Sequence, residues 1–484
     1  MVRLGMITNK IDYKVYSNKP FAIWANSRII NERLSANSYN RDYLDFAKAK
    51  NTFNFKKVSD IAKVTAMIGW KGLTTDDYVD EDGVYLLRTV DIKDNYIDLE
   101  NAVMAKREKV YEQPQIILKQ GDIIFSKDGT LGITAIVPRH QNKEMCVGST
   151  LARIRLNSNL DNYYVCAAFM SKIVQAQIGY FTSGIAQPHI TQEYINKLEI
   201  PIPSPEIQKY IGDKVRKAEE LREEAKRLKK EAEEILNAEL KLSYFNERVK
   251  DAPKIYNWIY GESIEIRIDS QYYINETNFI NNEMYKKGLK LKRISEIANV
   301  GKGFSYTSLD NKSIPYIRIS DLDDLLINFD TAELVDEKTY SEKKSSQLEK
   351  YDLIFAITGA TIGKVSLFYN SKYSKATLSS DTAFVRLKDK NDAAYVLLYL
   401  KSFIGQLGIL KGVTGATNRH LSLEHIGDIF IPVIDNKLKQ EINMRVIKAI
   451  DNVYLSKQLI KEAKQDVEDL IEGNFDMSKV KANS

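Results

Sequence analysis

The sequence has few of the residues that build metal sites, disulfide frameworks and membrane spans. Its 484 residues include only two cysteines, Cys146 and Cys166, and four histidines. Two cysteines are too few for a disulfide framework or a four-cysteine zinc site, so we expect two buried thiols in a reducing cytoplasm. No apolar run approaches the ~18 residues of a membrane span, and the first residues contain no continuous apolar segment typical of a signal peptide. The sequence therefore predicts a cytoplasmic protein with no metal and no membrane partner.

The chain also lacks an excess of charge of one sign. It has 70 basic and 65 acidic residues, for a formal net charge of +5. The pI of about 8.7 lies below the value above ~9 that is typical of nucleic-acid-binding domains. Net charge therefore permits nucleic-acid binding without arguing for it.

Catalytic motifs are missing as well. The segment 359–365, GATIGKV, is one residue short of a phosphate-binding loop and has Val365 where Ser or Thr would bind Mg²⁺. The counterpart at 129–133 has no lysine, so both glycine-rich segments are expected to form turns. The sequence contains no zinc-protease motif and no dinucleotide fingerprint. It also lacks the Asn-Pro-Pro-aromatic or Asp-Pro-Pro-aromatic segment of enzymes that methylate amino groups. We therefore expect a chain that is not an enzyme and that binds no cofactor.

What the chain does have is an internal duplication. The segments VSDIA at 58–62, LRTVDI at 87–92 and GDIIFS at 121–126 recur as ISEIA at 294–298, IRISDL at 317–322 and YDLIFA at 351–356. The loop Ser183-Gly184 with His189 recurs as Thr414-Gly415 with His420, and the offset drifts only from 230 to 236 residues. A period this long indicates two copies of one globular domain, since the repeats of solenoids are much shorter.

Each copy is predicted to be a mixed α/β domain. Compact apolar or β-branched runs, separated by turn residues, indicate strands at 84–90, 123–125, 314–319, 352–357 and 382–387. Apolar residues at helical spacing predict one helix near 163–178 in the first copy and one near 393–407 in the second.

A long charged helix is predicted behind each copy. After Pro205 and again after Pro432, apolar residues follow a 4-3 alternation, and Glu, Lys and Arg fill the other faces. Each helix has an apolar seam that needs a partner, so we expect the two to pair as an antiparallel coiled coil. About 36 residues at 1.5 Å each give a rod of roughly 55 Å, which exceeds the ~34–36 Å of one turn of B-DNA.

The loops differ between the copies although the scaffold repeats. The segment 67–72, MIGWKG, corresponds to 301–306, GKGFSY, and Gln187-Pro188-His189 corresponds to Asn418-Arg419-His420. Lys, Arg, Asn and Gln on such loops can hydrogen-bond to base edges and phosphates. The equivalent positions of His189 and His420 favour a contact or structural role over a catalytic pair.

The order of domain, long helix, domain and long helix resembles the specificity subunit of type I restriction–modification systems. Softer signatures agree: RLSA at 33–36, RIDS at 267–270, LKQGDII at 118–124 and the Ile-Pro exits at 200–201 and 431–432. Two departures are Tyr351 where the first copy has Gly121, and Ser35 where the second copy has Asp269.

This resemblance implies an α+β fold with two target-recognition domains. The expected segments are 1–204 (first recognition domain), 205–250 (first spacer helix), 251–432 (second recognition domain) and 433–484 (second spacer helix and tail). Each domain would read one half of a bipartite, asymmetric DNA site. The helices would set the spacer and dock methyltransferase subunits. The expected DNA-contacting residues are Trp70, Lys71, Arg88, Lys127, Ser183, Gln187, His189, Lys302, Tyr306, Arg318, Lys364, Asn418, Arg419 and His420.

The partners implied are double-stranded DNA, methyltransferase subunits and restriction or translocase subunits, with S-adenosylmethionine, ATP and Mg²⁺ on those subunits. A type IIB relative is equally compatible with the sequence. The competing interpretation is a scaffold that does not bind DNA, with two protein-binding domains on a coiled-coil spacer.

Overall fold

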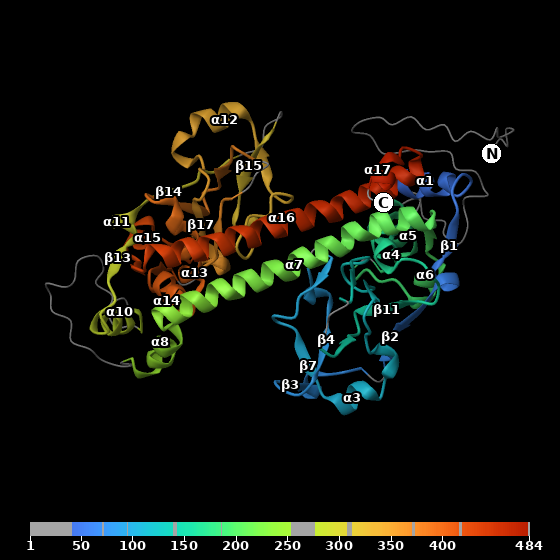
Figure 1. Ribbon diagram of the computed structural model, residues 1–484, viewed down its shortest axis with the longest axis horizontal. Coiled ribbons are helices and arrows are strands. Elements are labelled where there is room, and N and C mark those ends of the chain that lie inside the picture. The colour runs from blue at the N-terminus through green and yellow to red at the C-terminus, as the bar shows by residue number, and fades with distance from the viewer. Residues whose placement is uncertain are drawn as a thin grey trace. The chain divides into compact units, whose positions relative to one another are not determined.

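The computed structural model describes residues 41–69, 72–93, 95–138, 143–184, 186–252, 276–306, 312–369, 373–415 and 419–482. The chain divides into two compact units. Unit 1 comprises Met1–Glu220 and Leu455–Ser484, and unit 2 comprises Leu221–Tyr454. Each unit therefore contains one globular half together with part of each long helix (Figure 1).

Unit 1 is built on two four-stranded sheets. One sheet has the order β2-β11-β8-β9 and is antiparallel throughout, and the other has the order β10-β4-β7-β3 with β10 parallel to β4. The strands are β1 (Phe55–Lys57), β2 (Ala62–Ala66), β3 (Tyr78–Val79), β4 (Val84–Leu87), β5 (Ile92–Lys93), β6 (Tyr96–Ile97), β7 (Val103–Ala105), β8 (Ile123–Ser126), β9 (Thr134–Ile136), β10 (Met145–Val147), β11 (Leu151–Leu156) and β12 (Glu199–Pro201). The helices of its globular part are α1 (Arg41–Ala49), α2 (Val58–Ile61), α3 (Arg107–Tyr111), α4 (Asn162–Met170), α5 (Lys172–Phe181) and α6 (Gln192–Lys197).

Unit 2 repeats this plan. Its main sheet has the order β14-β20-β17-β18, and a three-stranded sheet has the order β16-β15-β19 with β19 parallel to β15. The strands are β13 (Leu291–Arg293), β14 (Ala298–Lys302), β15 (Ile314–Ile317), β16 (Glu333–Val335), β17 (Leu353–Ala356), β18 (Val365–Leu367), β19 (Thr377–Leu378), β20 (Thr382–Leu387), β21 (Val413–Thr414), β22 (His420–Leu421) and β23 (Phe430–Pro432). The helices are α8 (Leu242–Arg248), α10 (Glu276–Lys286), α11 (Ile294–Ile297), α12 (Glu337–Glu342), α13 (Ala393–Lys401), α14 (Phe403–Lys411) and α15 (Leu423–Asp428).

Each unit contains the same buried hydrogen bond, which confirms the duplication. The buried Tyr164 hydroxyl donates to the carbonyl of Pro201 at 2.7 Å, and Tyr395 donates in the same way to the carbonyl of Pro432. Buried hydroxyls and carbonyls need hydrogen-bond partners. This contact therefore fixes α4 against β12 in unit 1 and α13 against β23 in unit 2.

The prediction of one continuous helix in each copy is wrong. The first copy breaks at Ser171 into α4 and α5, and the second breaks at Ser402 into α13 and α14. Both serines have extended backbone, and each hydroxyl donates to the carbonyl three residues earlier, Ala168 at 2.7 Å and Tyr399 at 2.6 Å. Apolar periodicity does not reveal this break, because α4 and α13 bury nearly all of their residues and apolar residues continue into α5 and α14.

The two long helices are α7 (Pro205–Leu240, 36 residues) and α16 (Asn436–Glu472, 37 residues), and a short α17 (Ser478–Ala482) follows. Pro205 occupies the first position of α7, where a missing N–H costs nothing. The segment 205–250 contains α7 and, after a break at Lys241, the separate helix α8, and the segment 433–484 contains α16 and α17. Among the described residues no single helix is long and apolar enough to cross a membrane.

Within each unit the two helices pair antiparallel. In unit 1, Lys214 on α7 binds Asp466 on α16 at 2.6 Å. In unit 2, Glu224 binds Lys448 at 2.7 Å and Glu231 binds Arg445 at 3.2 Å, so residue numbers rise along α7 as they fall along α16. Apolar contacts fill the seam beside these ion pairs, as Ala225 and Leu228 of α7 do with Ala449 of α16.

The two cysteines are buried and form no disulfide. Burial raises the pKa of the Cys146 and Cys166 thiols to about 12, so both are protonated at neutral pH. They act as small apolar core residues.

Candidate nucleic-acid interface

In each unit, one short segment forms backbone hydrogen bonds with the loops that contain most of the candidate DNA-contacting residues. We call it the central turn: Gly148–Thr150 in unit 1 and Ser379–Asp381 in unit 2. Its first N–H donates to the end of a neighbouring strand, Gly148 to the Leu87 carbonyl at 2.8 Å and Ser379 to the Ile317 carbonyl at 2.9 Å. The turn therefore holds the candidate arginines Arg88 and Arg318, each of which directly follows one of these acceptors.

The last residue of the central turn binds a second loop. The N–H of Lys127 donates to the Thr150 carbonyl at 2.9 Å, and the N–H of Ile357 donates to the Asp381 carbonyl at 3.0 Å. In unit 2 the Thr358 hydroxyl also donates to the Asp381 carboxylate at 2.9 Å. The segments that follow β8 and β17 are thereby fixed on the edge of the central turn.

In unit 1 the loop that contains His189 pairs with the segment after β8. Ser183 and His189 exchange backbone hydrogen bonds of 2.9 and 2.8 Å, and the Ser183 Oγ lies 3.0 Å from Nε2 of His189. The N–H of Gly129 then donates to the Pro188 carbonyl at 2.9 Å. Lys127, Ser183 and His189 therefore lie together.

Unit 2 repeats this arrangement around His420. Strand β21 pairs with β22 so that Thr414 lies opposite His420, and the N–H of Gly359 donates to the Arg419 carbonyl at 3.1 Å. The side chains of Arg419 and His420 are exposed. Because the backbone contacts repeat while the side chains differ, the scaffold can hold different recognition groups in equivalent places.

Glycine is required where these loops turn most sharply. Gly184 and Gly415 have φ of +83° and +84°, a backbone conformation that residues with a Cβ rarely adopt. A Cβ at Gly184 would also lie 2.4 Å from the carbonyl oxygen of Gln187. The exposed Gln187 is thus placed by a tight turn beside Ser183.

The second glycine-rich loop of unit 2 leaves β14 and crosses the central turn. A Cβ at Gly303 would lie 2.1 Å from the Leu378 carbonyl oxygen, so only glycine allows this close crossing. The Ser305 hydroxyl donates to Oγ of Ser380 at 3.2 Å. The exposed Lys302 therefore begins a loop that lies against the central turn.

Tyr306 ends the described part of that loop in an aromatic cluster. Its ring centroid lies 5.7 Å from that of Tyr316, and its hydroxyl donates to Asp336 at 3.3 Å. The pKa of Asp336 lies below its usual range, chiefly because the backbone N–H of Thr339 donates to its carboxylate. Tyr306 is thus held by packing and by a charged acceptor.

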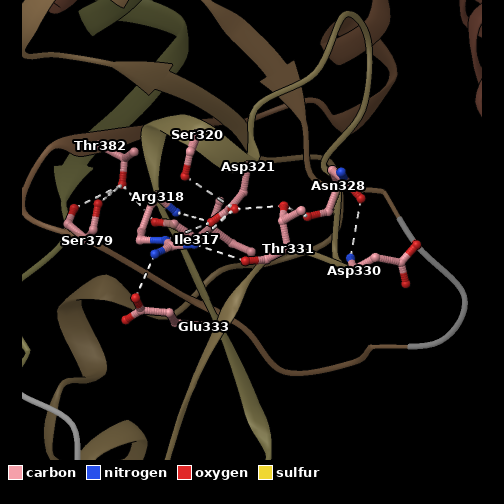
Figure 2. Close-up of polar contacts among 10 residues, drawn as sticks. All are labelled: Ile317, Arg318, Ser320, Asp321, Asn328, Asp330, Thr331, Glu333, Ser379 and Thr382. Atoms are coloured by element: carbon pink, nitrogen blue, oxygen red, sulfur yellow. Dashed lines mark hydrogen bonds and ion pairs between the residues drawn. The ribbon is translucent and has the colours of Figure 1, made fainter. Parts of the chain in front are cut away.

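Both candidate arginines are clamped by an aspartate three residues later. Arg318 donates Nε to Asp321 at 3.3 Å and Nη1 to Glu333 at 2.6 Å, and Nη2 also reaches the Thr331 carbonyl at 2.9 Å. Figure 2 shows the Arg318 guanidinium enclosed by these groups.

Arg88 repeats the clamp in unit 1. It donates to Asp91 through Nε at 3.0 Å and Nη2 at 3.1 Å, and to the Asn101 carbonyl at 3.2 Å. The hydrogen bonds that Arg88 donates to Asp91 are the main cause that raises the pKa of Arg88, and those to Asp321 do the same for Arg318. Both guanidinium groups are therefore committed to contacts within the protein.

The remaining candidate residues make fewer contacts with the central turn or lie outside the described residues. Lys364 is exposed immediately before β18, and its carbonyl accepts from the Ala356 N–H at 3.0 Å. Lys127 binds its neighbour Asp128. Trp70, Lys71 and Asn418 lie outside the described residues. No observation tests any of the fourteen residues as a DNA contact, so that list stays a prediction.

Sequence inspection missed the central turn itself. Thr150 and Asp381 are 231 residues apart, which is the same offset as that of Ser183 and Thr414. The repeat alignment therefore contained a signal, but GST at 148–150 and SSD at 379–381 have no recognisable motif. Their importance comes from hydrogen bonds to segments far away in the sequence.

The arrangement brings hydrogen-bond donors and acceptors from several loops together. Among the described residues no group of three or more His, Cys, Asp or Glu side chains could hold a metal ion. Exposed Lys, Arg, Gln, His and Ser side chains on glycine-dependent loops suit recognition of phosphates and base edges.

The chain is similar in sequence to a known family and to one of its relatives. Residues 50–234 and 286–465 match the family described as "Type I restriction modification DNA specificity domain". The type I restriction enzyme MjaIX specificity subunit of Methanocaldococcus jannaschii is 21% identical over 428 residues, which are 86% of this chain and 91% of that protein.

Two solved structures are also similar. The S subunit of a type I restriction–modification system from M. genitalium is 13% identical, with 88% of this chain and 97% of that chain covered and a TM-score of 0.43. The HsdS subunit from Thermoanaerobacter tengcongensis is 14% identical, with 87% and 97% covered and a TM-score of 0.30.

Proposed function

We propose, from the premise that this chain belongs to the type I restriction–modification DNA specificity family, that its two units read separate halves of one bipartite DNA site. As a member of that family the chain is a DNA sequence-recognition subunit. Unit 1 would read one half-site through the loops on its central turn, and unit 2 would read the other half-site through the equivalent loops.

The observation that carries this proposal is the repeated scaffold with unlike side chains. The backbone hydrogen bonds of the central turn recur in both units, but Lys127 corresponds to Ile357 and Pro188 to Arg419. A duplicated domain that kept one ligand would have little reason to vary the side chains of these loops and keep the framework. Two different half-sites account for both features.

We further propose that α7 and α16 set the distance between the half-sites and that methyltransferase subunits dock on this chain. A specificity subunit without catalytic groups needs partners that supply the chemistry. S-adenosylmethionine would bind to the methyltransferase subunits, and ATP and Mg²⁺ to translocating restriction subunits.

The test is to map modified bases in a host genome that expresses the partner subunits with this chain or its variants. Gln187→Ala should relax or abolish recognition in one half-site only, and Arg419→Ala in the other half-site only. Loss of a bidentate base contact costs about 1–3 kcal/mol. Arg227→Ala, an exposed arginine on α7, is the matched control and should leave both half-sites unchanged.

Two outcomes would overturn the proposal. One is a wild-type modification pattern with no bipartite sequence. The other is a set of loop variants that never changes the sequence. A salt titration of duplex binding by the reconstituted complex separates DNA recognition from a scaffold role, since phosphate contacts make log K fall linearly with log salt.

A further inference from the structure

The clamped arginines lie in a four-residue turn whose two middle residues differ between the units. The turn runs from Arg88 to Asp91 in unit 1, with Thr89 and Val90 between them, and from Arg318 to Asp321 in unit 2. In both turns the aspartate accepts the N–H of the arginine, at 2.8 and 2.9 Å, as well as its side chain.

The clamp is rigid because its acceptor is buried. Asp91 is 4% exposed and Asp321 is fully buried. In both turns a guanidinium nitrogen also binds a carbonyl thirteen residues along the chain, that of Asn101 or Thr331. An arginine that left this clamp to reach DNA would leave a buried carboxylate without its counter-charge. Arg88 and Arg318 are therefore placed to hold the turn.

The first middle residue of each turn anchors it to the protein. The Thr89 hydroxyl donates to the Thr150 hydroxyl at 3.0 Å, which ties the turn to the central turn of unit 1. Ile319 occupies the same place in unit 2, where it is half-buried against a cluster that includes Ile317 and Leu378.

The second middle residue faces outward in both units. Val90 is 68% exposed, the largest exposure of any large apolar residue in the described part of the chain. Its counterpart Ser320 is also exposed. The Ser320 hydroxyl donates to Oδ1 of Asp321 at 3.4 Å, as Figure 2 shows, so its oxygen remains available as an acceptor. An isopropyl group and a hydroxyl on the same rigid support offer different recognition chemistry.

We infer that the Arg-x-x-Asp turn presents its third residue to the DNA bases, so that Val90 reads a thymine in one half-site and Ser320 reads a polar base edge in the other. This inference rests on the proposed function. The 5-methyl group of thymine is the apolar feature of the major groove and accepts contact from small apolar side chains. A hydroxyl can donate or accept at either base of a pair.

Arg88 and Arg318 are positioning residues in this scheme. Their bidentate geometry fixes the turn, and a lysine cannot reproduce it although it keeps the charge. Arg88→Lys should therefore weaken discrimination at the same base pair that Val90 reads. A merely structural role would lower modification at all sites without changing the sequence preference.

The test uses the complex reconstituted from the full chain and its methyltransferase partner, with synthetic duplexes that carry the wild-type site. Each thymine of the two half-sites is replaced in turn by deoxyuridine, which removes only the methyl group. One replacement should slow wild-type methylation and leave Val90→Ser unaffected. Val90→Ser should also lose discrimination at that base pair by about 5- to 150-fold, as expected for one recognised pair.

Reciprocal and control variants make the result specific. Ser320→Val should change preference at one base pair of the other half-site. Val433→Ser makes the same chemical change at another exposed valine and should change neither half-site.

The inference is overturned if no deoxyuridine replacement slows the wild type, or if Val90→Ser keeps the wild-type preference. If those results occur while Gln187→Ala and Arg419→Ala still alter opposite half-sites, the proposed function stands and only the role of the turn is wrong. If none of these variants alters a half-site, the proposed function fails with it.

Discussion

Arg386 donates two hydrogen bonds to the carboxylate of Asp352, Nε to Oδ1 at 3.0 Å and Nη2 to Oδ2 at 2.7 Å. The same pair occurs in unit 1, where Arg155 donates to both oxygens of Asp122 at 2.6 Å. Each aspartate also caps the turn before its strand by accepting a backbone N–H. The repeated Asp-x-Ile motif of the sequence is thus a structural clamp between neighbouring strands.

We predict that Asp352→Asn destabilises unit 2 by about 3 kcal/mol, because it leaves the partly buried Arg386 guanidinium with only the exposed Glu349 as counter-charge. Denaturant unfolding of the full chain, with hydrogen exchange followed at β17 and β20, measures the change. Glu349→Gln is the matched control. It removes an exposed carboxylate from the same arginine and should cost less than about 1 kcal/mol. Equal losses in the two variants would contradict the clamp.

The sequence predicted the duplication and the long helices because both depend on patterns that repeat along the chain. The 4-3 alternation predicted α7 and α16, and the run 382–387 coincides with β20. The break at Ser171 was missed because it depends on one hydroxyl that binds the carbonyl of Ala168. Such a contact leaves no trace in the spacing of apolar residues.

The candidate site was predictable only as far as the loops differ between copies. Comparing the copies singled out Gln187 and Arg419 as polar loop residues whose counterparts, Asn418 and Pro188, differ from them. It did not reveal that Arg88 is held by Asp91, since an arginine on a recognition loop and an arginine in a clamp look the same in sequence. Only the positions of the carboxylate and of the Asn101 carbonyl distinguish the two.

Lys411 makes the stability of unit 2 depend on pH in the alkaline range. Its ammonium donates to Asn278 at 2.8 Å, and burial lowers its pKa to about 8, although the nearby Asp428 raises it and Arg293 lowers it further. The folded pKa lies below the unfolded value of about 10.4. The contribution of Lys411 to the free energy of unfolding is therefore fully present above pH ~10.4, and it is lost as the pH falls through about 8.

We therefore predict that Lys411→Met gains stability relative to the wild type as the pH falls from 10 to 7, by about 2–3 kcal/mol. Urea unfolding at several pH values, with hydrogen exchange followed at α14, provides the measurement. Lys286→Met removes an exposed lysine from α10, and its stability difference from wild type should stay constant with pH. A constant difference for Lys411→Met would show that the lysine is charged and solvated in the folded protein.

We predict that the purified chain, free of partner subunits, has no methylation, cleavage or ATPase activity. The phosphate-loop-like segment after β17 forms a turn in which the Gly363 carbonyl accepts from Gln406 at 2.9 Å. Gln175 makes the same contact with Gly132 at 3.0 Å, so these glycines serve packing. Assays with radiolabelled S-adenosylmethionine and with ATP test this. Turnover that a point substitution in this chain abolishes would refute it.

The last prediction concerns the spacing of the half-sites. If the paired helices set this distance, shortening them changes the nonspecific spacer without changing any base contact. Deletion of one heptad, Ala225–Glu231, keeps the apolar register of α7 and shortens it by ~10.5 Å. That length corresponds to about three base-pair steps at ~3.4 Å each.

The cross-helix contacts show how to make this deletion without breaking the pairing. Glu231 binds Arg445, and Ala225 packs with Ala449, so the segment of α16 that faces the deleted heptad is Asn443–Ala449. Removing both segments together should preserve the register on either side. Removing the α7 segment alone should mismatch the helices and lower the stability of the chain.

The double deletion should recognise the same two half-sequences with a shorter spacer, or lose DNA binding if the changed rotation around the duplex is not absorbed. Base-modification mapping distinguishes these results from an unchanged spacer. Full activity with the original spacer would contradict the role of the helices as a ruler. In that case their remaining role in our proposal would be to dock the methyltransferase subunits.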